Sequence, residues 1–160
     1  MIELTPGQIA EYFQRSYAAV DGLWFVKMEE KYGFEAALAM DNEVWKVFPK
    51  VQARLLKNMG KLGSGIDALY ECLATKLALE GFKVESKKQE DGFAIIINEC
   101  PWHNAMLKSG REKLSGKVGT VICNTEYAVW ASEFGHDIKF ELKQQICQGA
   151  PSCILQFKAV

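Results

Sequence analysis

Four of the five cysteines in this 160-residue chain, and one of its two histidines, lie within a single stretch of about fifty residues. They are Cys100, His103, Cys123, Cys147 and Cys153. Cysteine thiolate and histidine imidazole are the ligands that zinc prefers in proteins, four of them in a tetrahedron. This concentration predicts a metal or thiol site in the second half of the chain.

The expected metal is zinc, held by Cys100, Cys123, Cys147 and Cys153. The spacing differs from that of a compact zinc finger, because 23 residues separate the first two cysteines and 24 separate the next two. Two alternatives use the same side chains. Either the four cysteines are buried thiols that bind no ligand, since free cysteine is often buried, or they hold an iron-sulfur cluster.

Cys100 has a second interpretation, as a nucleophile. It directly precedes Pro101, a residue typical of the first position of a helix. The amide groups and dipole at a helix start lower the pKa of a thiol and favour the thiolate. His103, one turn along, would then act as the base. Cys100 and His103 are therefore the candidate catalytic residues.

Trp102 is the aromatic residue best placed to contact a ligand. It lies between Cys100 and His103 at an expected strand-to-helix junction, the kind of place where small-ligand pockets form. We assign ligand contacts to Trp102, His103 and Trp45. The other tryptophans, Trp24 and Trp130, fit the core better.

Composition excludes several classes of partner. The chain is 49% apolar and 24% charged, with net charge -1 and its 19 basic residues scattered. No basic patch suited to nucleic acid or an anionic membrane stands out. No apolar run approaches the roughly 20 residues of a spanning helix, and residues 1–6 lack the pattern of a secretory signal. We expect a cytoplasmic protein that binds a small-molecule ligand or substrate, and leave open a homodimer.

The pattern predicts one domain, residues 1–160, with a helical part at 1–62 and a mixed part at 63–160. Thr5 and Pro6 begin a helix, a second one runs from Asp21 to Gly33, and a long apolar stripe at helical spacing follows from Phe34. Pro49 interrupts that stripe and predicts a kink or break. Ser64 and Asp67 form a capping-box-like pair before the next helix.

After Gly81 the apolar period changes to that of strands. A hairpin is expected around Asp91 and Gly92, followed by two helices and a second hairpin that ends near Cys153. Cys147 breaks the alternation of the strand before it, so that strand must bulge or end near Gln144 if Cys147 is to face inward.

The chain resembles the family of L-2-amino-thiazoline-4-carboxylate hydrolase-like proteins over nearly its whole length. The matching segments are residues 21–25, 29–33, 44–45, 52–54, 100–102 and 130–135. This resemblance implies, if the protein is an enzyme, a metal- or thiol-dependent hydrolase that opens a small sulfur or nitrogen heterocycle.

From about Gly81 onward the layout also resembles the 4-vinyl reductase domain. There a helix cysteine and a carboxy-terminal cysteine pair hold zinc beside a small aromatic-ligand pocket, which implies zinc at Cys123, Cys147 and Cys153 and a pocket near Trp102. Where phenol-sensing members have a glutamate ligand, this chain has Gln144. Cys100 is then our first choice for the fourth ligand, His103 the second and Glu141 the third.

Together these patterns predict an α/β (α+β) fold, with an amino-terminal helical layer packed on a four-stranded, mainly antiparallel sheet and two crossing helices. The leading function is small-molecule binding, with a structural zinc because four protein ligands leave no open position. A hydrolase would instead keep three ligands and a water.

Overall fold

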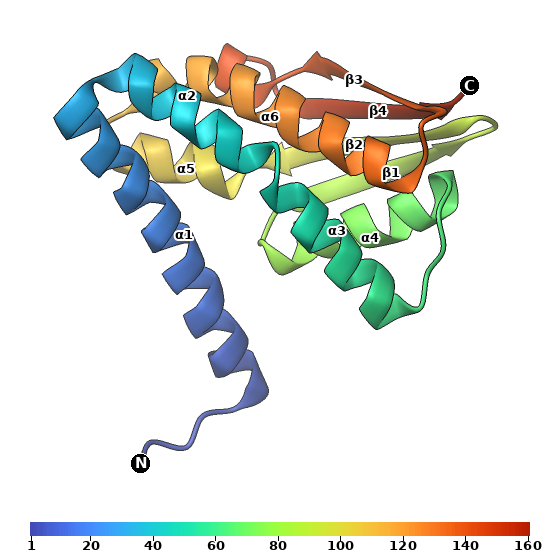
Figure 1. Cartoon of the computed structure of the whole chain (residues 1–160), viewed down its shortest axis with the longest axis horizontal. Helices are drawn as coiled ribbons and strands as arrows, with labels where there is room; N and C mark the ends of the chain where they lie inside the picture. The colour runs from blue at the N-terminus through green and yellow to red at the C-terminus, as the bar shows by residue number, and fades with distance from the viewer. The chain divides into compact units, whose positions relative to one another are not determined.

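The computed structural model describes all 160 residues and divides into two compact units, Met1–Asp41 and Asn42–Val160. Its secondary structure is α+β, as expected, with helices and a single four-stranded sheet (Figure 1). No helix is both long enough and apolar enough to cross a membrane.

The smaller unit contains α1, Pro6–Tyr32, which is one continuous helix rather than the two segments predicted. Thr5 caps it as expected, since its hydroxyl accepts from the Gln8 amide and the Gln8 side chain accepts from the Thr5 amide. Gly33 ends it with φ +85°, a conformation that favours glycine. At that corner the rings of Phe25 and Phe34 meet edge-on, with centroids 5.9 Å apart.

Helix α2, Phe34–Trp45, begins in the smaller unit and ends in the larger one. A break at residues 46–47 separates it from α3, Phe48–Gly60, in whose first turn Pro49 lies. The predicted interruption is confirmed. Proline fits there because the first turn needs no amide donor for a helical hydrogen bond.

Helix α4, Ile66–Leu79, follows the loop after α3. Its start differs from the prediction, because Gly65 is the N-cap and makes no side-chain capping bond. The Ser64 hydroxyl instead accepts a hydrogen bond from Lys57. The predicted capping pair of Ser64 and Asp67 is therefore wrong, since the lysine engages the serine.

The sheet contains β1, Lys83–Gln89; β2, Gly92–Glu99; β3, Ile138–Gln144; and β4, Cys153–Ala159. All neighbours pair antiparallel in the order β1-β2-β4-β3. Strand β2 is an inner strand of the sheet. Ile95 and Ile97 are buried, whereas Ile96 on the opposite face is only half-buried.

The end of β3 explains how Cys147 can face inward although it breaks the alternation of that strand. The register with β4 shifts between Leu142 and Gln144, and the strand ends at Gln144. A short 3-10 turn, η1, Ile146–Gln148, then carries Cys147. Both expected features, an irregularity and an early end, are present, and they release Cys147 from the alternation of the strand.

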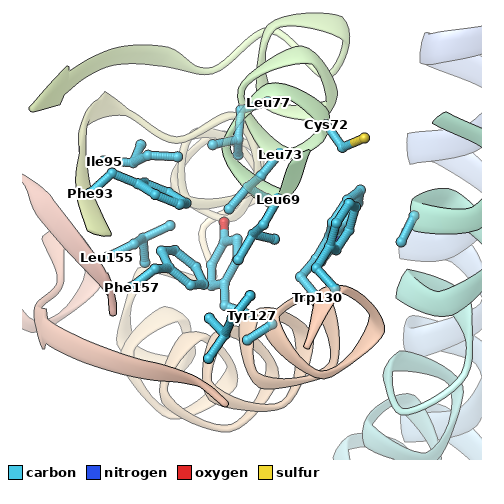
Figure 2. Close-up of a cluster of buried hydrophobic side chains, with 14 of the residues drawn as sticks. Leu69, Cys72, Leu73, Leu77, Phe93, Ile95, Tyr127, Trp130, Leu155 and Phe157 are labelled. Carbon is cyan, nitrogen blue, oxygen red and sulfur yellow. The ribbon is translucent and has the colours of Figure 1, made fainter. Parts of the chain in front are cut away.

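Two helices connect the hairpins: α5, Pro101–Lys108, and α6, Glu112–Phe134. Helices α4 and α6 pack on the sheet and enclose the main core between them (Figure 2). Tyr127 and Trp130 of α6 point into this core, which also contains side chains from α4 and from the sheet: Leu69, Leu73, Leu77, Phe93, Ile95, Leu155 and Phe157. This packing fixes α6, which carries Cys123.

Candidate thiol and aromatic site

Cys147 lies against α6 because that helix has glycine where another residue would have a side chain. A Cβ built on Gly119 would lie 2.6 Å from the Cys147 sulfur, and one on Gly116 would lie 2.9 Å from the Cys147 carbonyl oxygen. Gln148 reinforces the contact, since its side-chain amide donates to the Gly116 carbonyl at 3.0 Å. The two glycines, one helical turn apart, are the sequence signal for this close approach.

Cys123 and Cys153 reach the same region from α6 and β4. Cys123 lies four residues after Gly119, so it projects from the same face of α6 one turn further on. Cys153 is buried at the start of β4, paired with Ile97 of β2. Its sulfur accepts a hydrogen bond from the Ile146 amide, 3.2 Å away, which ties β4 to the turn that holds Cys147.

Cys100 is the N-cap of α5, as its position before Pro101 predicted. Its sulfur accepts from the His103 amide at 3.5 Å. The expected lowering of its pKa is wrong: burial raises the pKa of the Cys100 thiol to about 11, and the helix amides offset only part of that. Desolvation disfavours the charged thiolate more strongly than a single helix start favours it. Cys100 is a neutral thiol near pH 7.

The four thiols form one electrostatic neighbourhood. Burial is the largest cause of the raised pKa of Cys123, and negative charge on Cys100, Cys153 or Cys147 would raise that pKa further. Cys147 interacts in the same way with Cys100, and Cys153 with Cys147. None of the four forms a disulfide. The chain therefore brings together thiols that are up to 53 positions apart in the sequence.

The donor chemistry of this cluster suits zinc, because four thiols are a common structural zinc set. The positions of the side chains do not suit zinc, because no group of three or more His, Cys, Asp or Glu side chains is arranged to hold a metal ion. Glu141, the third candidate for a fourth ligand, is exposed and pairs with Lys143. At Gln144 the side-chain amide donates to the Ser152 carbonyl at 3.2 Å, which a glutamate could not do.

Sequence reasoning missed a buried ion pair beside the thiols. Lys76 of α4 and Glu126 of α6 are 2% and 5% exposed and hydrogen bond to each other, and Lys76 also pairs with Glu80 at 2.9 Å. The carboxylates keep the pKa of Lys76 above its usual value despite burial. Glu126 also raises the pKa of Cys123 and Cys100. No local pattern identified these residues, because each lies on an otherwise ordinary helix.

The residues assigned to a ligand lie close together. The indole rings of Trp45 and Trp102 meet edge-on, with centroids 6.3 Å apart and planes at 87°, and Phe48 packs edge-on against Trp45 at 5.8 Å. Trp45 is buried and Trp102 half-buried. His103 follows Trp102, and its Nδ1 hydrogen bonds with the buried Ser115 hydroxyl at 2.8 Å. This bond orients the imidazole and engages one of its two nitrogens.

Cys72 takes no part in either group. It is buried on α4 beside the core leucines, and burial raises the pKa of its thiol (Figure 2).

Residues 7–154 match the sequence model of the DUF6125 family, which is described as a family of unknown function. The chain belongs to the DUF6125 family. No curated protein sequence matches it. Among solved structures, this DUF6125 chain is similar to a crystal structure of the phenol-responsive sensory domain of the transcription activator PoxR with phenol. That comparison has a TM-score of 0.51 and 15% identity, and it covers 89% of this chain and 73% of the other. At this identity the likeness establishes a shared fold.

Proposed function

We propose that this domain binds a small aromatic molecule beside the tryptophan pair Trp45 and Trp102. The observation that carries the proposal is the edge-on contact of these rings next to an oriented histidine. Aromatic rings attract one another edge-to-face by about 0.5–1.5 kcal/mol beyond the area they bury. A phenol-sensing domain of the same fold supports the aromatic class of ligand.

Each of the three assigned residues has a distinct role in this proposal. Buried Trp45 forms a fixed wall, and half-buried Trp102 is the ring that moves to admit a ligand. Ser115 engages His103 Nδ1, which leaves Nε2 to hydrogen bond with a hydroxyl on the ligand. Binding sites of this kind combine apolar walls with a few oriented polar groups.

Titration calorimetry with phenol tests the proposal, with cyclohexanol as a probe of similar size that lacks the aromatic ring. We expect heat of binding with phenol and much weaker binding with cyclohexanol. Trp102→Leu and His103→Phe should each weaken phenol binding at least tenfold. Trp24→Leu is the matched control: Trp24 is 69% exposed on α1, so its predicted place in the core is wrong. Equal binding by Trp102→Leu and the wild type would refute the site.

We also propose that Cys100, Cys123, Cys147 and Cys153 bind zinc in a structural role. Their type, their burial and their mutual electrostatic interaction support this. Because no set of ligands is formed as the side chains stand, zinc binding requires them to rotate toward a common centre. When bound, zinc would neutralise thiolates that are otherwise costly to bury.

Metal analysis of the purified protein tests the zinc proposal. We expect about one zinc per chain, lost in Cys123→Ser and Cys147→Ser but kept in Cys72→Ala. Protein purified without oxygen should be colourless, whereas an iron-sulfur cluster would give it colour. A wild-type protein without metal would remove this proposal and leave that of ligand binding intact.

The family match is to DUF6125 and gives no support to the resemblance to L-2-amino-thiazoline-4-carboxylate hydrolase-like proteins. A hydrolase, which that resemblance implied, is the second candidate. It needs three protein ligands and a bound water, or a reactive thiol. The raised pKa of Cys100 argues against the thiol route, because a neutral thiol is a poor nucleophile. A metal stoichiometry of one with full retention in Cys100→Ala would favour the hydrolase arrangement.

A further inference from the structure

The imidazole ring of His103 has a single hydrogen-bond partner in the chain, Ser115 of α6. The serine hydroxyl lies 2.8 Å from His103 Nδ1, and Ser115 is 3% exposed. The second ring nitrogen, Nε2, makes no hydrogen bond within the chain and is not completely enclosed. Whether Nε2 donates or accepts is therefore decided at Nδ1, where the ring meets a buried hydroxyl.

The Ser115 hydroxyl differs from the other hydroxyl groups on these helices. Serine and threonine in helices often donate to a backbone carbonyl three or four residues earlier. Ser109, Thr120 and Ser132 each donate in this way, at 2.8 to 3.0 Å. Ser115 makes no such bond, so His103 Nδ1 is the single acceptor for its proton.

Burial sets the direction of the bond between Ser115 and His103. If Nδ1 carried the hydrogen and donated to the serine oxygen, the serine proton would be buried without an acceptor. A buried donor of that kind loses the hydrogen bonds it had with water, and orphaned buried donors are rarer in proteins than acceptors with an unused lone pair. The serine therefore donates and Nδ1 accepts. In a neutral imidazole the hydrogen is then on Nε2.

We propose that Ser115 fixes His103 as the tautomer with hydrogen on Nε2, so that the site selects aromatic molecules with a hydrogen-bond acceptor on the ring. This inference rests on the aromatic ligand proposed above and names its class. Phenolic, carbonyl and carboxylate oxygens are acceptors of this kind, and phenol would be recognised through its oxygen rather than its proton. Ser115 is a positioning residue, since it acts on the ligand through His103.

The first test reads the tautomer without a ligand, by proton–nitrogen correlation NMR of the imidazole rings in isotope-labelled protein at a pH where they are neutral. The chain has two histidines, and exposed His136 is the internal reference. We expect hydrogen on Nε2 of His103, with a shift toward the other tautomer in Ser115→Ala. Ser132→Ala is the matched control, because it removes a hydroxyl of the same helix that donates to a backbone carbonyl. Hydrogen on Nδ1 in the wild type, or a spectrum that Ser115→Ala leaves unchanged, would overturn the proposal.

The second test is titration calorimetry with two probes of similar size. Phenol can both donate and accept, whereas pyridine N-oxide, an aromatic ring with one exocyclic oxygen, can only accept. We expect both to bind the wild type, and both to bind about tenfold more weakly to His103→Phe, the loss expected for one hydrogen bond. Ser115→Thr keeps the hydroxyl and should bind both probes more tightly than Ser115→Ala.

The aromatic site and the acceptor class fail in different ways. Binding of phenol without binding of pyridine N-oxide would overturn the acceptor class and leave the aromatic site standing. Binding of both probes with hydrogen on Nδ1 in the spectrum would overturn the role of Ser115 alone. If neither probe binds, the aromatic site is refuted and the ligand class falls with it.

Discussion

Cys147 and Gly119 lie in such close contact that a methyl group on the glycine would come within 2.6 Å of the cysteine sulfur. The absence of a side chain on this turn of α6 is what admits η1, and with it Cys147, to the neighbourhood of Cys123. The same applies to Gly116, which faces the Cys147 carbonyl oxygen at 2.9 Å. Close approach, rather than flexibility, explains these two helical glycines.

We therefore predict that Gly119→Ala and Gly116→Ala each lower the free energy of unfolding, by about 1–3 kcal/mol, because the added methyl forces η1 away from α6. Urea denaturation measures the change. Gly22→Ala in α1 is the control, since a methyl group added there would meet nothing within 4 Å. That substitution should instead stabilise by about 0.5–1 kcal/mol, as alanine favours helix. Two stabilising substitutions in α6 would contradict the packing described.

Removal of the buried ammonium should be the most damaging single change outside the aromatic core. Lys76→Met leaves Glu126 without its buried counter-charge, which typically costs about 3–5 kcal/mol. The double variant Lys76→Met/Glu126→Leu should recover much of that loss. Lys158→Met is the matched control. Its pair with Asp91 is half exposed, and such surface pairs contribute about 1 kcal/mol or less.

Alkaline pH should destabilise the metal-free protein. The folded-state pKa of Cys100 is about 11, above its ordinary value of 9.0, and the pKa of Lys76 is also raised. The folded state then holds protons that the unfolded chain has lost, so the free energy of unfolding decreases as pH rises. Stability should be complete below about pH 8.5 and fall between about pH 9 and 11. Urea denaturation of chelator-treated protein measures this, and Cys100→Ala should flatten the curve.

Gln144→Glu tests the structural role of the side-chain amide at this position. The Gln144 amide donates to both the carbonyl and the hydroxyl of Ser152, at 3.2 and 3.1 Å. A carboxylate cannot donate and would face the carbonyl oxygen, so we expect destabilisation of about 1–3 kcal/mol in metal-free protein. Gln14→Glu on α1 is a control outside the sheet. A stabilised Gln144→Glu variant would contradict this role of the amide.

Much of the local structure followed from the sequence. Thr5 caps α1, Gly33 ends it, and Pro49 lies in the first turn of α3 after a break. Cys147 breaks the alternation of the strand before it, and the irregularity that we therefore predicted near Gln144 is present. These predictions succeeded because each depends on steric or hydrogen-bonding preferences of a few neighbouring residues.

Errors arose where distant residues compete with a local preference. Ser64 does not cap α4, because Lys57 engages its hydroxyl. Cys100 does not have a lowered pKa, because burial by other elements outweighs the helix start. Lys76 and Glu126 were overlooked, since neither shows from its own helix that the other will meet it in the core.

The sequence alone determined which segments become helices and strands, and which side chains have the chemistry of a metal or ligand site. Only the tertiary structure decided that Trp45 meets Trp102, and that four cysteines from two helices, a turn and a strand share one neighbourhood. The reason is physical: hydrogen-bonding and steric preferences act within a few residues, whereas burial and side-chain encounter depend on how α4, α6 and the sheet pack together.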